Sequence, residues 1–179
     1  MTQAALIYWS KTGNTKKVAE AIEQTLQEAG VEVTTAAPQH ADDIDWYDYD
    51  LVCLGFPYYR WSPPAQMADY LKRTFARYRR QDRIKVGAPH VPGKYGLVFC
   101  TYSGPHSGLD EATPAGDYAA QYFAHLGFEV LAKWYVVGEF HGSLENSTLG
   151  RLGDIRGRPD EQDLEQIRQD TIEILARIQ

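Results

Sequence analysis

The stretch Ser10-Lys11-Thr12-Gly13-Asn14-Thr15 decides how the rest of this chain is interpreted. Residues 4–9, directly before it, form an apolar run of strand length. Directly after it, Val18, Ile22 and Leu26 recur at a spacing of four, which places them on one face of a helix. The stretch is therefore expected to be a loop that joins the end of a strand to the start of a helix.

A loop in this position is suited to an anion, because the first N–H groups of a helix lack intrahelical acceptors and carry partial positive charge. Ser10, Thr12 and Thr15 add hydroxyl groups, Asn14 adds an amide, and Gly13 lets the backbone approach an anion closely. A simple helix cap by Ser10 or Thr12 would need fewer polar side chains. Neither G-x-x-x-x-G-K-[ST] nor G-x-G-x-x-G is present. The loop therefore predicts a phosphate site of another type.

Length and composition indicate one globular domain over residues 1–179, with 44% hydrophobic and 23% charged residues. The net charge of −6 argues against nucleic acid and anionic membranes as main partners. The first residues lack the basic start of a secretory signal, and no apolar run has the length of a membrane span. We therefore expect a cytoplasmic protein without membrane insertion.

The only cysteines, Cys53 and Cys100, each lie in an apolar run that resembles a strand. Two isolated thiols in such runs form neither a disulfide framework nor a zinc or iron–sulfur site. We expect both to be inert core residues, and we expect no metal site.

Strands and helices are expected to alternate along the chain. The predicted strands are residues 4–9, 31–36, 51–56, 95–101 and 129–137. Helices are expected after Thr15, from Pro64, from Thr113 and after Asp160. The third is expected to bury Tyr118, Tyr122 and Leu126. The acidic residues 39–50 indicate a solvated linker or a short turn. This alternation predicts an α/β fold with an open parallel sheet and helices on both faces.

Three stretches of the chain resemble the flavodoxin-like FMN-binding family. Residues 10–15 match its phosphate loop, and Gly55-Phe56-Pro57-Tyr58-Tyr59 with downstream prolines is similar to its G-x-P-x-Y loop. Thr101-Tyr102-Ser103-Gly104 takes the place of the loop that contacts the flavin ring. The resemblance covers nearly the whole chain, and it implies a doubly wound five-stranded sheet of order 2-1-3-4-5. In such a sheet, the loops after strands one, three and four meet at one edge.

The resemblance implies FMN as the cofactor. We expect the phosphate to bind the loop at residues 10–15, and the isoalloxazine ring to lie between the loops after strands three and four. Aromatic side chains in these loops can stack on the ring. The expected cofactor-binding residues are Ser10, Thr12, Gly13, Asn14, Thr15, Pro57, Tyr58, Tyr59, Trp61, Thr101, Tyr102, Ser103 and Gly104. No catalytic residue is assigned.

The chain departs from the family in two places. Flavodoxins often carry a glycine after the third strand, where a peptide rotates on one-electron reduction, but here no glycine lies between Gly55 and Gly87. Proline and bulky residues in this loop are expected to resist positive φ angles, so that the two reduction steps overlap. Residues 138–159, between the last strand and the last helix, exceed an ordinary loop length. We expect this segment to fold near the flavin or into a subunit contact.

Three functions remain open from the sequence. The first is electron transfer through non-covalent FMN to a redox partner protein or to a small-molecule acceptor such as a quinone. The second is an NAD(P)H-dependent FMN or quinone oxidoreductase, which the loop after the third strand favours. The third, a binding module without flavin, fits poorly with an intact phosphate loop. The sequence leaves open whether the chain is an enzyme and whether it forms a homo-oligomer.

Overall fold

Five parallel strands form one sheet in the computed structural model, which describes residues 2–178. The strand order is β2-β1-β3-β4-β5, so the chain starts near the middle of the sheet and crosses over after β2. The predicted fold class and strand order are confirmed. The strands are β1 (Gln3–Tyr8), β2 (Glu32–Ala36), β3 (Leu51–Pro57), β4 (Tyr95–Tyr102) and β5 (Glu129–Val137).

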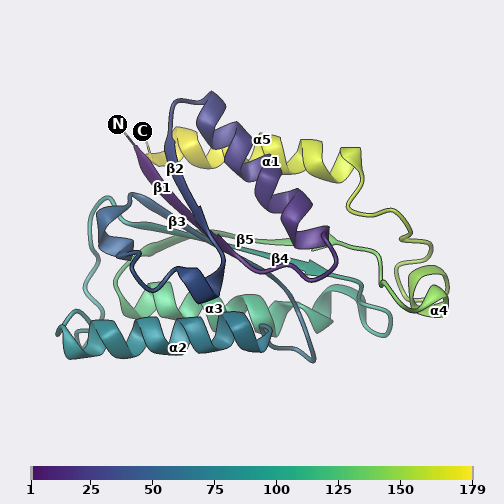
Figure 1. Cartoon of the computed structure of the whole chain (residues 1–179), viewed down its shortest axis with the longest axis horizontal. Coiled ribbons are helices and arrows are strands. Elements are labelled where there is room, and N and C mark those ends of the chain that lie inside the picture. Colours follow the sequence, from purple (N-terminus) through teal and green to yellow (C-terminus); the bar gives the residue numbers. More distant parts are fainter. Residues whose placement is uncertain (1, 179) are drawn as a thin grey trace.

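Helices cover both faces of the sheet. α1 and α5 lie on one face, and α2 and α3 lie on the other (Figure 1). The short helix α4 stands apart, beyond the carboxyl end of β5. The helices are α1 (Asn14–Glu28), α2 (Ala65–Arg80), α3 (Thr113–His125), α4 (Leu144–Thr148) and α5 (Glu161–Ile178).

Each face of the sheet carries its own hydrophobic core, and β3 contributes to both. Val52, Leu54 and Phe56 face α2 and α3, whereas Leu51 and Cys53 face α1 and α5. A strand covered on both faces needs apolar residues at every position, which explains the unbroken apolar run in the sequence. Cys53 and Cys100 are fully buried, and burial raises the pKa of both thiols. Both cysteines are therefore inert core residues, as predicted.

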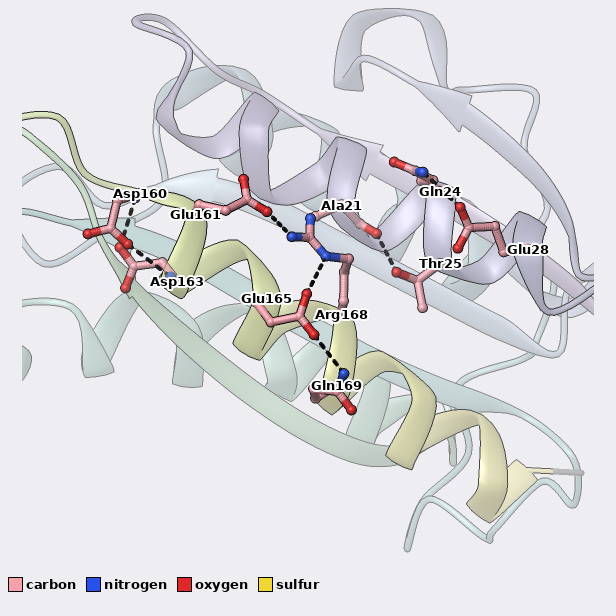
Figure 2. Close-up of polar contacts among 10 residues, drawn as sticks. All are labelled: Ala21, Gln24, Thr25, Glu28, Asp160, Glu161, Asp163, Glu165, Arg168 and Gln169. Atoms are coloured by element: carbon pink, nitrogen blue, oxygen red, sulfur yellow. Dashed lines mark hydrogen bonds and ion pairs between the residues drawn. The ribbon is translucent and has the colours of Figure 1, made fainter.

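The last helix begins at the predicted cap and packs beside α1 (Figure 2). Asp160 Oδ1 accepts a hydrogen bond from the N–H of Asp163, and Asp163 Oδ2 accepts one from the N–H of Asp160. Such a reciprocal capping box satisfies two N–H groups that lack intrahelical acceptors. Further along α5, Arg168 pairs with Glu161 and Glu165 on the exposed side. The cap that the sequence predicts therefore marks the start of α5.

Residues 39–50 contain a short turn, which is one of the two expectations, but the other, a solvated linker, is wrong. Trp46, in a short 3₁₀ turn, is fully buried against Phe123, with ring centroids 4.9 Å apart. Its indole N–H donates to Tyr70 Oη at 2.8 Å, and its backbone N–H donates to Tyr78 Oη at 2.6 Å. Arg77 of α2 also donates to the backbone of this segment, at Ile44. Trp46, which lies among acidic residues in the sequence, therefore anchors the segment to α2.

The predicted buried face of α3 is also wrong in part. Tyr118 is exposed and Tyr122 is only partly buried, while Leu126 is buried as expected. The sheet-facing side consists instead of alanines and Phe123, because small side chains let the helix lie close to the strands. The tyrosines turn toward α2, where Tyr122 meets the edge of Phe75 at 5.5 Å. The alanines with Phe123 and the predicted residues both recur at helical spacing. The larger tyrosine side chains suggested the wrong face as the buried one.

Candidate functional site

A cavity of about 400 Å³ opens at the carboxyl ends of the strands. This volume falls within the usual range for small-molecule sites. Segments that follow β1, β3, β4 and β5 all contribute to the lining. The lining residues are Ser10, Lys11, Thr12, Asn14, Thr15, Pro57, Tyr58, Tyr59, Arg60, Thr101, Tyr102, Ser103, Glu139, Phe140 and His141.

One side of the cavity, the helix side, is the loop at residues 10–15. Ser10 Oγ accepts hydrogen bonds from the N–H groups of Gly13 and Lys16, both at 3.2 Å, and so holds the loop in a tight curve. Gly13 stands at the N-cap of α1 with φ 101° and no side-chain cap. Within residues 2–178, no hydrogen bond uses the N–H groups of Asn14 or Thr15. These groups are available to an anion at the positive end of the helix dipole.

The helix side is joined directly to the end of β4. Thr15 Oγ1 and Thr101 Oγ1 lie 2.8 Å apart, and both threonines are almost fully buried. A hydroxyl can donate one hydrogen bond and accept others, so this pair can still serve a ligand. The contact holds the loop at residues 10–15, called the phosphate-type loop below, against the end of β4, which contributes to the opposite side of the cavity.

The other side of the cavity, the aromatic side, comprises Pro57, Tyr58, Tyr59, Thr101, Tyr102 and Ser103. The N–H of Tyr58 donates to the carbonyl of Thr101 at 3.1 Å, which continues the pairing of β3 and β4 beyond the strand ends. Burial raises the pKa of Tyr58, Tyr59 and Tyr102, so their hydroxyls stay protonated at neutral pH. The aromatic side therefore offers flat, uncharged rings.

The loop after β3 closes in a narrow turn. Tyr59 and Ser62 exchange both backbone hydrogen bonds, at 2.8 and 3.1 Å. The residues between them, Arg60 and Trp61, have φ angles of 49° and 65°. Two positive φ angles in a two-residue turn are typical of type I′, which favours asparagine and glycine. The expectation that bulky residues here avoid positive φ is wrong, because the paired backbone of the turn enforces it.

Trp61 does not line the cavity, although it was predicted to bind the cofactor. Its side chain is 62% exposed at the tip of the turn. In contrast, Tyr59 turns back toward Trp9, and the two rings meet edge to face at 6.0 Å. The turn thus directs Tyr59 inward and Trp61 outward, a division that the order of residues alone does not reveal.

The loop after β4 is closed by a glycine that the sequence also assigned to the site. Gly104 has φ 49°, and its carbonyl accepts the N–H of Gly108 at 3.0 Å. A Cβ atom on Gly104 would lie 2.5 Å from the carbonyl oxygen of Gly108, which is too close for any side chain. Neither Gly104 nor Gly13 lines the cavity. Both shape the backbone that does.

Residues 139–141 supply a wall that the sequence did not assign to the site. Asn14 Nδ2 donates to the carbonyl of Glu139 at 3.0 Å, and Asn14 Oδ1 lies 3.3 Å from His141 Nε2. A Cβ on Gly138 would lie 2.6 Å from Asn14 Nδ2, so glycine is required for this close approach. Phe140 completes the wall. The length of the 138–159 segment predicted that it folds near the flavin or into a subunit contact. Its first residues do line the cavity, but only the fold shows that they lie beside the loop at residues 10–15.

Charged side chains are sparse at the cavity. Lys11 and Arg60 contribute the cations of the lining, and both are exposed. Glu139 contributes the carboxylate of the lining, and it accepts the N–H of Gly157 at 2.8 Å. Within residues 2–178, no group of three or more His, Cys, Asp or Glu side chains is placed to hold a metal ion. The described chain also contains no helix that is long and apolar enough to cross a membrane.

These features fit a cofactor with a phosphate at one end and a flat ring at the other. The helix side provides unpaired N–H groups and hydroxyls for the phosphate. The aromatic side provides the tyrosine rings and Pro57 for the flat ring system. Sequence reasoning identified most of the lining, because the helix side is one continuous loop and the aromatic side consists of two short loops. It missed Lys11, Arg60 and residues 139–141.

Known proteins resemble this chain in sequence and in fold. Residues 6–169 match the family model described as Flavodoxin. A comparison with curated protein sequences found no match. Among solved structures, a flavodoxin from Streptococcus pneumoniae TIGR4 is similar with a TM-score of 0.67 and 20% identity, covering 98% of this chain and 99% of that one. A flavodoxin from the domain Archaea has a TM-score of 0.66 and 18% identity, with 99% of each chain covered. Oxidised Flavodoxin 1 from Bacillus cereus has a TM-score of 0.66 and 17% identity, with 98% of each covered.

Proposed function

This chain belongs to the flavodoxin family of FMN-binding electron-transfer proteins, and we propose that it holds FMN in the cavity at the carboxyl ends of β1, β3 and β4. The phosphate would bind the helix side, at Ser10, Thr12, Gly13, Asn14 and Thr15. The isoalloxazine ring would lie on the aromatic side, against Pro57, Tyr58, Tyr59 and the backbone of residues 101–104. The ring supplies the electron-carrying chemistry once FMN is bound.

One observation carries this assignment. Asn14 and Thr15, whose N–H groups make no hydrogen bond within residues 2–178, line the same cavity as the tyrosines of the aromatic side. Uncharged donors at a helix start suit a phosphate monoester, while aromatic rings in the lining offer apolar faces to a flat ligand. Residues 139–141 would cover the phosphate and hold Asn14 in place. In this proposal, hydrogen bonds from the helix side and apolar contact from the aromatic side would bind and orient the cofactor.

We propose a redox partner protein as the physiological electron acceptor, since flavodoxins transfer electrons to such partners. Tyr59, Trp61 and Phe140 are 40% or more exposed and give the protein apolar contact area beside or near the cavity. A quinone as acceptor, location in the cytoplasm and assembly into a homo-oligomer stay predictions.

Fluorescence titration of the cofactor-free protein with FMN and with FAD tests the cofactor assignment. FMN is expected to bind and lose its fluorescence, whereas FAD is expected to bind weakly, because the helix side encloses a terminal phosphate. Stopped-flow reduction of the loaded protein with NADH and NADPH then separates the remaining alternatives. Rapid reduction by either nucleotide would favour an NAD(P)H-dependent oxidoreductase over a carrier that depends on a protein donor.

A further inference from the structure

A buried carboxylate, Glu111, lies directly behind the aromatic side of the cavity. Its side chain is only 7% exposed, in the short 3₁₀ turn Gly108–Glu111 that precedes α3. Glu111 Oε1 accepts the backbone N–H groups of His106 and Ser107, both at 2.7 Å. Glu111 Oε2 accepts a short hydrogen bond from Tyr58 Oη. One carboxylate therefore links the loop after β3 to the loop after β4.

These contacts keep Glu111 ionised. Burial alone would raise the pKa of this carboxyl group, but the hydrogen bonds from Tyr58 and from the N–H groups of Ser107 and His106 outweigh burial and lower it. A carboxylate that accepts several such bonds is favoured in its charged form. The same arrangement raises the pKa of Tyr58, through burial first and then through its bond to Glu111. The proton thus stays on the tyrosine and the negative charge stays on Glu111.

The position of this charge matters because Tyr58 lines the cavity and Glu111 does not. The carboxylate is shielded from water behind the ring of Tyr58, where screening is weaker than at the surface. The two loops that it joins are the ones expected to enclose the isoalloxazine. Without Glu111, the N–H groups of His106 and Ser107 and the hydroxyl of Tyr58 would lose their common acceptor.

We propose that Glu111 is a positioning residue for the flavin. Glu111 holds Tyr58 and the loop after β4 together as one wall of the cavity, and its negative charge lowers the midpoint potential of the bound ring. The inference rests on the proposed FMN site. Reduction of FMN adds two electrons, which dithionite supplies in a titration, and the buffer supplies the accompanying protons. Any net negative charge left on the ring is disfavoured by a fixed negative charge nearby.

Two substitutions separate the charge of Glu111 from its positioning role. Glu111→Gln keeps an oxygen acceptor for the two N–H groups and removes the charge, so the midpoint potential of the bound FMN should become more positive at pH 7. Asp110→Asn is the matched control, because Asp110 precedes Glu111 but is exposed. It removes the same charge and should shift the potential less. Glu111→Ala removes charge and acceptor, and hydrogen exchange at His106 and Ser107 in the cofactor-free protein should accelerate several-fold.

Each measurement can overturn part of the proposal. A Glu111→Gln potential equal to that of the wild type, or a shift no larger than that of Asp110→Asn, would refute the electrostatic role. Unchanged exchange at His106 and Ser107 in Glu111→Ala would refute the positioning role. If Glu111→Ala does not fold, exchange in Glu111→Gln replaces it, with a smaller acceleration expected because the amide oxygen is a weaker acceptor. A wild-type protein that binds no FMN would contradict the proposed function instead. The hydrogen-exchange data would still test whether Glu111 holds the loop after β4 in place.

Discussion

The helix side of the cavity is built from consecutive residues, whereas the aromatic side and its support come from segments far apart in the chain. Residues 10–15 contain the phosphate-type loop complete, and Ser10 folds it through contacts three and six residues away. The aromatic side depends on Glu111, which reaches back 53 residues to Tyr58. The wall at residues 139–141 reaches back 125 residues from Glu139 to Asn14. A local site can be read from a motif, while an assembled one follows only from the fold.

The largest expected effect is on the helix side. Replacing Thr12 and Thr15 with Val keeps the size of both side chains but removes two hydroxyls from the cavity. Loss of hydrogen bonds to a charged group costs about 1.5–3 kcal/mol each, so FMN affinity should fall by about 10²–10⁴-fold. Isothermal titration calorimetry would measure this loss. Thr25→Val is a matched control in α1, because its hydroxyl bonds only within the helix, to Ala21. Equal affinity in the double variant and the wild type would place the phosphate elsewhere.

A test of the assembled side is Gly104→Ala. The substitution forces a left-handed residue to carry a Cβ and drives that atom into the backbone of Gly108. We expect a loss of about 1–3 kcal/mol in the free energy of unfolding, measured by urea denaturation of the cofactor-free protein. Gly142→Ala is the control, since Gly142 has φ 99° but open space around its Cβ position. Equal losses in the two variants would show that the close approach to Gly108 contributes nothing.

The contact between the helix side and the wall at residues 139–141 can be broken at Asn14. His141→Ala removes one of its contacts, while Asn14→Ala removes both and also the amide itself. A neutral hydrogen bond contributes about 0.5–1.5 kcal/mol, so FMN should dissociate roughly 2–10-fold faster from His141→Ala and faster still from Asn14→Ala. Both dissociation rates can be measured by stopped flow, with an excess of another, tighter-binding apoprotein that captures the released FMN. Asn146→Ala, in α4 of the same segment, should leave the rate unchanged.

The same contrast explains which parts of the structure the sequence predicted. The strands, the Asp160 cap and the loop at residues 10–15 depend on neighbours along the chain, so the sequence predicts them. The strand order followed from the resemblance to the flavodoxin-like family. Trp46, Glu111 and His141 lie in polar surroundings in the sequence, and their partners lie on other elements. Tyr118 has the spacing of a buried residue and is exposed, because Phe123 and the alanines fill the space over the sheet. Side-chain size and spacing do not encode which of two helical faces meets the sheet.

A smaller effect, visible only in acid, is expected from Glu111. Its pKa is lowered in the folded protein, so its ionised form stabilises the fold above the ordinary glutamate pKa of about 4.3, and this contribution is lost as the pH falls through the lower folded value. Glu111→Gln has no such titration. The difference in free energy of unfolding between wild type and Glu111→Gln should therefore shrink between pH 7 and pH 3, measured in urea without cofactor. A constant difference would mean that the pKa of Glu111 is the same in the folded and the unfolded protein.

The smallest expected effect concerns Trp61, a bulky residue that has a positive φ angle although its side chain is not buried. A non-glycine residue at φ 65° costs about 1–2 kcal/mol, and a side chain that is 62% exposed recovers little of this by burial. Trp61→Gly should raise the free energy of unfolding by about 0.5–1 kcal/mol after the extra entropy of an unfolded glycine is subtracted. Trp61→Ala is the control, because it removes the indole but keeps the strain, so it should not stabilise the protein.

Strain that persists near a binding site points to a role in function. If the rigid turn makes the two reduction steps overlap, Trp61→Gly should also let its peptide rotate, and long-wavelength absorbance at half reduction in a dithionite titration should increase over wild type. A stabilised variant with an unchanged titration would show that the turn is strained without influence on the flavin.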